Sequence, residues 1–447
     1  MKTKLKNLFI AALLVAPVIF CACSGNKTAG GSKFNDSLYT SAYIAQLGGS
    51  EPDRALAIID TLEMLKKHPT FYINYMRCSV YNNSAQYRSA IHYGTLTVSD
   101  PLCKEKKPEV YLETLFIIAQ GEYMHDNCAQ SIKLIKQALE MANERGLENI
   151  QSKCYFLLGN VQIDLGDNGK ALKSFLKAKE IAMKMLNAKP DFMSFETVFS
   201  CTSMIIETLS KDNIYSEAEK YIPELLGMLE KAKTIKDLNE HYIDRVKWHA
   251  YAECFTLYNL MGKTEEAEKY RQLSEDTRSA KLPYSREKYT TYYILKKDYK
   301  QALENIDITR QFFVENRDTL CIDYKDAVLN HEFNVYKGMG NYAMATKVAE
   351  KINACRDSID KKTKEENAAE LAKIYETQEK EKQIAEQKAE LAKHKNILIA
   401  VVVLLVIGVA FIVIVMRFNR RVNRRNKTIV ATINQMMQKE DQLTRLQ

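Results

Sequence analysis

Apolar and polar residues recur with a helical spacing along most of the chain, and the clearest stretch is YFLLGNVQIDLGDNGKALKSFLKAKE at 155–180. In this stretch Ala171, Phe175 and Ala178 stand at positions i, i+4 and i+7, which places them on one face of a helix. Gly166 precedes that face and marks a turn. The pattern therefore predicts two consecutive helices that are joined at Gly166.

The same order of aromatic and small residues recurs at intervals of about 35–49 residues. One copy contains Gly262 and Ala267, a second contains Gly340 and Ala345, and a third contains Ala302. We expect roughly eight helical hairpins between residues 36 and 355. Further copies centre on Ala90 and, more weakly, on Ala55, Ser131 and Ala218.

These hairpins resemble tetratricopeptide repeats, in which two antiparallel helices carry small residues where they cross. Gly159 and Ala171 are 12 residues apart, which is the spacing that this family uses. The resemblance implies an all-α fold, a tetratricopeptide-like solenoid in which each hairpin buries its apolar face against its neighbours. Glycine (16) and proline (8) are scarce in the 447 residues, which disfavours an all-β fold with many turns.

The resemblance also implies a binding site for a protein or peptide. In tetratricopeptide proteins the first helix of each hairpin lines a concave groove that holds an extended peptide or a partner helix. Asparagine amides can pair with a peptide backbone, and tyrosine rings offer flat apolar area. The alternative is that polar groove residues are only solvated. The register gives as candidates Tyr72, Tyr75, Asn82, Asn83, Phe156, Asn160, Asp164, Asn330, Asn334 and Lys337.

A second pattern, near the C-terminus, is a run of 20 uncharged residues at 397–416. At about 1.5 Å per residue, a helix of this length covers about 30 Å, the thickness of the hydrocarbon core of a bilayer. We therefore expect a transmembrane helix over 396–416, followed by a basic segment and a short cytoplasmic helix over 417–447. The flanking cations that indicate the cytoplasmic side are Arg417, Arg420, Arg421, Arg424, Arg425 and Lys427.

A shorter apolar run at 8–20 follows three lysines at the N-terminus. It is too short to span a bilayer and is typical of a secretory signal. The letters FCACSG at its end resemble a bacterial lipobox, although Phe20 stands where leucine is usual. This resemblance implies a lipoprotein-type signal peptide over 1–22, lipidation of Cys23 and a flexible tether over 23–35. The alternatives are an ordinary signal peptide and an uncleaved anchor.

The net charge of +8 is concentrated next to the membrane. Three positive charges lie in the leader and six follow the apolar run, so the rest of the chain has a net charge of −1. A nearly neutral domain is not drawn to phosphate, which argues against nucleic acid as its partner. With the basic side in the cytoplasm, the solenoid is expected in the periplasm of a bacterium and the span in its inner membrane.

The segment 356–395, between the solenoid and the apolar run, is rich in Ala, Glu, Lys and Gln and contains no Gly or Pro. Its many Glu/Lys pairs four residues apart predict a long solvated helix. Apolar residues seven positions apart allow a coiled coil and with it a homodimer, whereas the alternative is a single charged connecting helix. These residues are Ile384, Leu391 and Leu398, which lead into the membrane, and Ile429, Met436 and Leu443 after it.

The sequence contains none of the short motifs of nucleotide-binding, hydrolase or zinc sites, namely GxxxxGK[ST], GxSxG, HExxH or CxxC. The seven histidines have no metal-binding spacing, so we expect no metal and no cofactor. Most cysteines are expected to be small apolar core residues, with a disulfide between Cys321 and Cys355 as the alternative. We expect a binding protein and not an enzyme, because an enzyme would require a buried polar cluster inside the solenoid.

The whole layout resembles the sensory half of membrane-bound regulators from Bacteroidota. In those proteins the cytoplasmic end continues into a helix-turn-helix domain or a histidine kinase, and 417–447 contains neither. The resemblance implies that a periplasmic peptide or protein binds the solenoid and that the charged helix relays this event across the membrane. The alternative is a structural scaffold that gathers envelope proteins without transmembrane signalling.

Overall fold

The structure is a computed structural model that describes residues 40–446, apart from 237, 283–284 and 317–318. The predicted signal peptide, the predicted lipidation site Cys23 and the predicted tether lie outside these residues. Within them there is no β-strand, and all regular structure is helical, as the sequence predicts.

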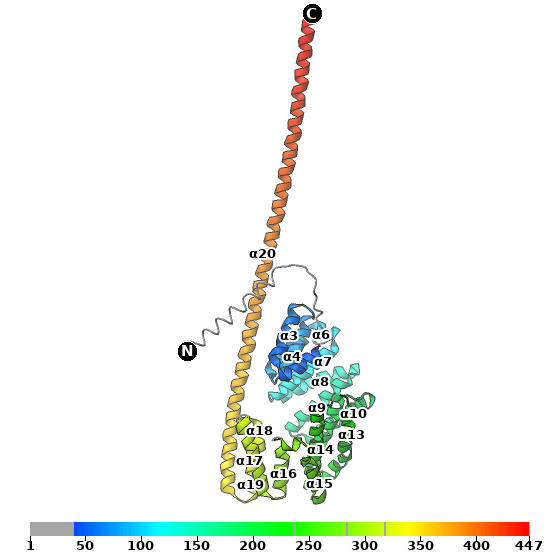
Figure 1. Cartoon of the computed structure of the whole chain (residues 1–447), viewed down its shortest axis with the longest axis vertical. Coiled ribbons are helices and arrows are strands. Elements are labelled where there is room, and N and C mark those ends of the chain that lie inside the picture. Colours follow the sequence, from blue (N-terminus) through cyan, green and yellow to red (C-terminus); the bar gives the residue numbers. More distant parts are fainter. Residues whose placement is uncertain (1–39, 237, 283–284, 317–318, 447) are drawn as a thin grey trace. The chain divides into compact units, whose positions relative to one another are not determined.

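The first of two compact units ends at Thr363, and from residue 40 on it consists of helical hairpins that follow one another in chain order (Figure 1). The helices of its first half are α2 (Ser41–Ser50), α3 (Pro52–Met64), α4 (Thr70–Asn83), α5 (Tyr87–Ser99), α6 (Pro101–Lys106), α7 (Pro108–Met124), α8 (Cys128–Arg145), α9 (Glu148–Asp164) and α10 (Asn168–Ala188). Those of its second half are α11 (Phe192–Lys211), α12 (Tyr215–Glu219), α13 (Ile222–Ala232), α14 (Glu240–Leu260), α15 (Thr264–Glu275), η2 (Ser279–Lys281), α16 (Arg286–Leu295), α17 (Tyr299–Asn316), α18 (Ile322–Tyr324), the π-helix η4 (Lys325–Asn330), α19 (His331–Gly338) and the start of α20 (Tyr342–Leu446).

Eight hairpins result among the described residues. They pair α2 with α3, α4 with α5, α7 with α8, α9 with α10, α11 with α12 and α13, α14 with α15, α16 with α17, and α19 with the start of α20. The arrangement is a tetratricopeptide-like α-solenoid, which confirms the predicted fold class.

Seven of these hairpins turn through the same backbone motif. At Gly166 the backbone N–H donates to the carbonyl of Ile163 (2.9 Å), and the N–H of Asp167 donates to that of Gln162 (2.8 Å). This pair of bonds is the Schellman motif, which satisfies the last carbonyls of the first helix. The residue at the turn is left-handed, with φ between 58° and 74°, in each case. These residues are Ala85, Asp126, Gly166, Asn213, Gly262, Lys297 and Gly340.

The two helices of a hairpin cross at small residues. A β-carbon on Gly159 would overlap the ring of Phe175, so the glycine lets α10 approach α9 closely. At Gly94 of α5 the close approach is to the next hairpin, because a β-carbon there would lie 2.7 Å from Ile118 of α7. The repeat positions predicted from the sequence are buried, at 4% exposure or less, namely Ala171, Phe175, Ala178, Ala267, Ala302 and Ala345.

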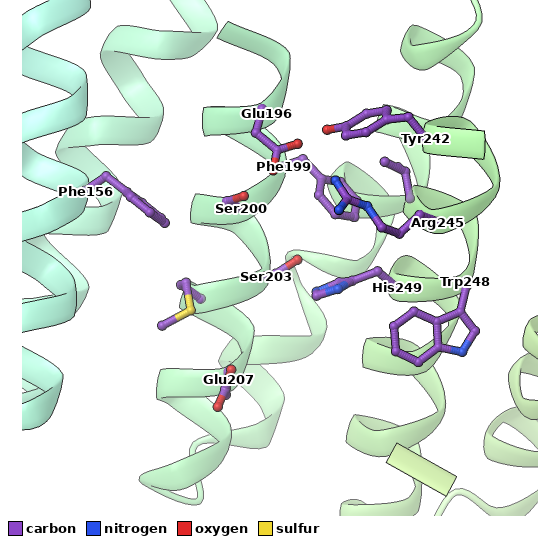
Figure 2. A pocket seen from close by; sticks show the side chains of 12 residues that line it. Phe156, Glu196, Phe199, Ser200, Ser203, Glu207, Tyr242, Arg245, Trp248 and His249 are labelled. Carbon is purple, nitrogen blue, oxygen red and sulfur yellow. The ribbon is translucent and has the colours of Figure 1, made fainter. Parts of the chain in front are cut away.

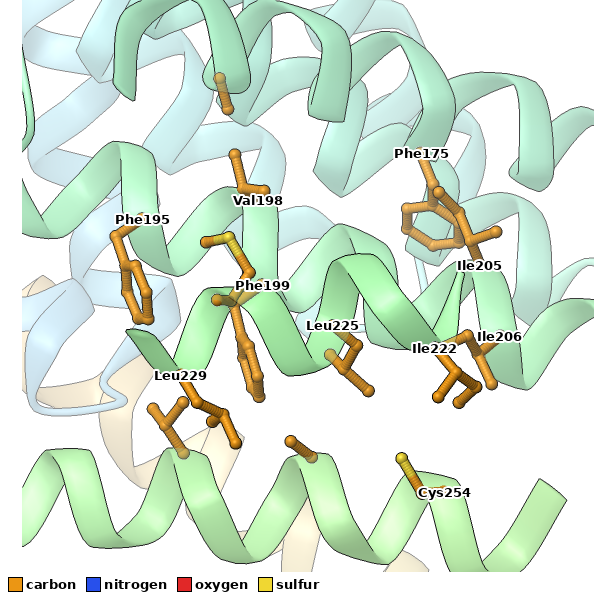
Figure 3. Packing of buried hydrophobic residues seen from close by; sticks show 14 of the residues in the cluster. Phe175, Phe195, Val198, Phe199, Ile205, Ile206, Ile222, Leu225, Leu229 and Cys254 are labelled. Carbon is orange, nitrogen blue, oxygen red and sulfur yellow. The ribbon is translucent and has the colours of Figure 1, made fainter. Parts of the chain in front are cut away.

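An extended apolar cluster joins α10, α11, α13 and α14 (Figure 3). Phe195 and Phe199 stack with their ring centroids 6.2 Å apart, and Leu225 and Leu229 reach them from α13. Burying a side chain of this size removes it from water at a gain of about 2–3 kcal/mol each. The cluster therefore holds α11 in position and leaves the opposite face of this helix available for polar residues.

Helix α20 begins as the second helix of the last hairpin. Val348 and Cys355 are buried, Cys355 belongs to the cluster around Val335, and Ile352 packs against that cluster. The thiol of Cys355 donates to the carbonyl of Thr319 (3.9 Å). The last hairpin is thus built partly from α20.

The second unit, Lys364–Gln447, is formed by the remainder of α20. One segment of it, Lys382–Glu440, contains a window long and apolar enough to cross a membrane, and none of that window is buried by protein. The apolar side chains of this window are exposed, as Leu404 and Phe411 illustrate at 67% and 65%. By length and composition, one helix in the described residues could span a membrane.

Candidate binding groove

Two cavities open on the side of the solenoid formed by the first helices of the hairpins. The first, here called the N-terminal cavity, has a volume of about 400 Å³ and is lined from α2, α4, α7, α9 and α11. The second, here called the central cavity, has a volume of about 580 Å³ and is lined from α9, α11 and α14. Phe156, Glu196 and Ser200 line both cavities, so the two form one groove.

Four of the residues predicted for the groove line the N-terminal cavity: Tyr75, Asn82, Asn83 and Phe156. The amide of Asn83 donates to the carbonyl of Ala45 (2.7 Å), which ties α4 to the first hairpin. Phe156 also lines the central cavity, where Figure 2 shows its ring pointing from α9 toward α11.

The other predicted residues line neither cavity. The hydroxyl of Tyr72 donates to Ser41 Oγ (3.1 Å), and Asp164 accepts from the hydroxyl of Tyr123. Asn330 donates to Asp326 Oδ1 (2.8 Å) within the π-helix. Of the remaining three, Asn160 is half-buried on α9, and Asn334 and Lys337 are exposed on α19.

The sequence analysis missed the residues that α11 contributes. Glu196, Ser200, Ser203 and Glu207 stand at i, i+4, i+7 and i+11, so they form a polar stripe along one face of α11. Figure 2 shows these side chains in successive turns of α11. The stripe is visible in the sequence, but nothing local shows which helix faces it.

Helix α14 faces the stripe with Tyr242, Arg245, Trp248 and His249. Figure 2 shows Tyr242, Arg245 and His249 pointing from α14 toward α11. The guanidinium of Arg245 lies over the ring of Tyr242, 4.9 Å from its centroid, which is a cation–π arrangement. The central cavity thus combines aromatic faces with both signs of charge.

A buried polar cluster lies at one end of the central cavity. Glu253, whose side chain is 5% exposed, accepts a hydrogen bond from Lys288 Nζ at 2.9 Å, and His249 Nε2 lies 3.7 Å from it. Glu253 holds the pKa of Lys288 above its ordinary range against the effect of burial. Burial lowers the pKa of His249, and so do Lys288 and Arg245, so the imidazole is neutral near pH 7.

Such a cluster is what the sequence analysis required of an enzyme and could not find. Its charges are, however, satisfied by one another: Lys288 neutralises Glu253, and Lys211 lies 3.0 Å from Glu207. Burial would raise the pKa of Glu207, but Lys288 and Lys211 lower it below its ordinary value. Among the described residues no group of three or more His, Cys, Asp or Glu could hold a metal ion.

Several buried polar atoms of the groove lack a hydrogen-bond partner among the described residues. They include Ser203 Oγ and Tyr242 Oη in the central cavity and Asn82 Oδ1 in the N-terminal cavity. Thr202 and Thr208, elsewhere on α11, bond back to the carbonyl four residues earlier, whereas Ser203 does not. Unpaired buried polar groups cost about 1–3 kcal/mol each, so a ligand that pairs with them recovers this energy.

No protein-family model and no curated protein matches this sequence. Among solved structures, a Rap protein complexed with competence and sporulation factor is 17% identical, with a TM-score of 0.48 over 78% of this chain and 93% of that one. Aspartyl phosphate phosphatase F from Bacillus subtilis is 15% identical, with a TM-score of 0.47 over 74% and 96%. The apo quorum sensor NprR from B. thuringiensis is 16% identical, with a TM-score of 0.41 over 75% and 98%. At these identities and TM-scores the likeness concerns the fold alone.

Proposed function

We propose that this protein binds an extended stretch of polypeptide along the groove formed by the N-terminal and central cavities. The observation that carries the proposal is the shared lining by Phe156, Glu196 and Ser200, which makes one groove out of the first helices of several hairpins. The groove contains aromatic rings and unpaired polar atoms, which suit recognition of the side chains and backbone of a peptide. The protein acts by binding and not by catalysis.

We further propose that α20 anchors the protein in the bacterial inner membrane. The apolar window within Lys382–Glu440 supports a single span, and the arginines after it favour a cytoplasmic C-terminus. The solenoid then lies in the periplasm, with lipid on Cys23 as a second anchor. Residues of α20 also complete the last hairpin, so the effect of peptide binding can pass along this helix. In a homodimer, α20 relays this effect to a cytoplasmic partner or domain.

Peptide binding is tested with the full chain in detergent and a display library of random peptides. Ser200→Trp fills the junction of the two cavities, and Lys177→Trp, on the second helix α10, is the matched control because Lys177 lines neither cavity. We expect enriched peptides to bind the wild type and Lys177→Trp and to lose at least tenfold in affinity for Ser200→Trp. Failure to enrich any peptide, or equal binding to all three proteins, would contradict the proposal.

The relay is tested by disulfide cross-linking between two copies through a cysteine at position 391 or 436, both of which are exposed in α20. A bound peptide is expected to change the cross-linking rate of Leu391→Cys and of Met436→Cys. Rates that are unchanged at both positions would contradict the relay and favour a scaffold.

A further inference from the structure

The groove contains three carboxylates, and only two of them have a cationic partner close by. Glu113 lies 2.9 Å from Lys153, and Glu207 lies 3.0 Å from Lys211. Glu196, at the junction of the two cavities, has no cation within 4 Å in the part of the chain that the structure describes. The groove therefore keeps one carboxylate without an ion pair at its centre.

Glu196 stands among groups that suit a long cationic side chain. Phe156 and Tyr242 offer ring faces on either side of it, and Figure 2 shows the hydroxyl end of Tyr242 pointing toward the Glu196 carboxylate. Ser203, which is 6% exposed, lines the same cavity with an unpartnered hydroxyl. Aromatic faces bind alkyl stems and cations, while a carboxylate and a hydroxyl accept N–H bonds.

The charges of the groove agree with a cationic ligand. Of its lining carboxylates, Glu113 is paired with Lys153 and Glu207 with Lys211, which leaves Glu196 without an ion pair among the described residues. Arg245 is exposed and lies over Tyr242 rather than in an ion pair with Glu196. A cation brought by a ligand would give Glu196 a partner.

Burial raises the pKa of Glu196, and the opposing effects of Arg245 and Ser200 do not cancel this shift. A carboxyl whose folded-state pKa is raised is harder to ionise in the folded protein, so stability falls as the pH rises from the unfolded value through the folded one. At neutral pH the ionised Glu196 therefore costs the unoccupied protein stability. A carboxylate that lowers stability and has no ion pair is expected where a ligand supplies the cation.

We propose that the groove selects peptides with a lysine or arginine whose side chain lies against Phe156 and Tyr242 and whose charged end pairs with Glu196. This inference rests on the proposed peptide binding and specifies the ligand class. Arg245 is the cation already present in this part of the groove, and the ligand side chain lies beside it. The unpaired hydroxyls of Ser203 and Tyr242 accept the remaining N–H donors of the ligand side chain. The flanking apolar residues of the peptide occupy the two cavities.

The experiment compares the peptides that a random display library yields with the full chain in detergent and with its Glu196→Gln variant. The wild type is expected to enrich lysine or arginine at one fixed position, and Glu196→Gln is expected to lose this enrichment. Glu207→Gln is the matched control, because it removes the same charge from the same cavity at a carboxylate that Lys211 already pairs. For a wild-type peptide, affinity should fall at least tenfold with Glu196→Gln and less than threefold with Glu207→Gln.

A second measurement replaces the selected lysine by norleucine, which keeps the apolar stem and removes the charge. The norleucine peptide should bind the wild type at least tenfold more weakly than the lysine peptide does. For Glu196→Gln, which already binds weakly, the affinities of the two peptides should agree within twofold. Enriched peptides without a fixed basic position, or equal loss on both proteins, would overturn the assignment to Glu196 and leave peptide binding intact. Failure to enrich any peptide on the wild type would instead remove the proposed function and this inference with it.

The affinity for a basic peptide should depend on pH in one direction. A bound cation favours the ionised carboxylate, so affinity is full above the pKa of Glu196 in the free groove and falls as the pH drops below it. This loss of affinity at low pH should not appear with Glu196→Gln. Other titratable or charged groups that face the groove are unchanged in this variant, namely Tyr75, Glu113, Lys153, Glu207, Tyr242, Arg245 and His249.

Discussion

The hairpin α9–α10 and the hairpin α16–α17 have the same backbone turn but are held in place by different side chains. In α9–α10 the ring of Phe175 lies on Gly159, and the buried face of the second helix is apolar. The hairpin α16–α17 is joined to its neighbours by ion pairs, Lys288 with Glu253 and Arg310 with Glu332, both at 2.9 Å. The two examples contrast an apolar junction inside a hairpin with a charged junction between hairpins, and α9–α10 has a charged junction as well, through Lys153 and Glu113 at 2.9 Å.

The apolar junction should be the more sensitive to loss of volume. Replacing Phe175, which is fully buried, by alanine should lower the free energy of unfolding by about 4 kcal/mol, because the ring leaves a cavity beside Gly159. The measurement is urea unfolding of the full chain in detergent, followed by circular dichroism. Leu165→Ala, at a side chain that is 57% exposed, is the control and should change stability by less than about 0.5 kcal/mol. A loss below about 1.5 kcal/mol for Phe175→Ala would mean that the helices collapse into the space.

The charged junction should depend on both partners being present. Glu253→Gln leaves Lys288 without its closest anion and should cost about 2–3 kcal/mol in the same measurement. Adding Lys288→Met to this variant should recover at least half of the loss, because no uncompensated charge remains. If the double variant were no more stable than the single one, the two junctions would differ in packing and not in charge.

The turns that the two hairpins share should respond in opposite directions. Gly166→Ala forces a β-carbon into the left-handed conformation and should cost about 1 kcal/mol, although the space around it is open. Lys297→Gly should instead stabilise the protein by up to about 1 kcal/mol, since Lys297 has a φ of 59°. Gly169→Ala, inside α10 and also in open space, is the control and should stabilise by about 0.5–1 kcal/mol. If both substitutions, at positions 166 and 297, changed the free energy of unfolding in the same direction, the left-handed turn conformation would not be what decides these changes.

The fold could be predicted from the sequence where small residues mark the repeat. Gly159, Gly166 and Phe175 identify one hairpin, and the glycines at 262 and 340 identify two further turns. The turns at Ala85 and Lys297 carry no such signal, because the contacts of the two helices hold these residues in the left-handed conformation. Local sequence does not show a conformation that tertiary contacts impose.

The groove was only partly predictable for a related reason. Tyr75, Asn82, Asn83 and Phe156 follow from the register of their own helices. The stripe on α11 acquires its role only when α14 and α9 face it, and this depends on how hairpins stack. The ionisation of Glu196 likewise depends on burial by residues far away in the sequence, which no local pattern encodes.

The sharing of α20 between the last hairpin and the apolar segment has a practical consequence for making a soluble fragment. Truncation at the turn near Gly340 would remove Val348, Ile352 and Cys355 and leave Val335 and Val328 uncovered. A fragment that ends after Thr363, where the first unit ends, retains all of these contacts and omits the apolar window. The usable boundary for expression therefore lies inside a helix and not in a loop.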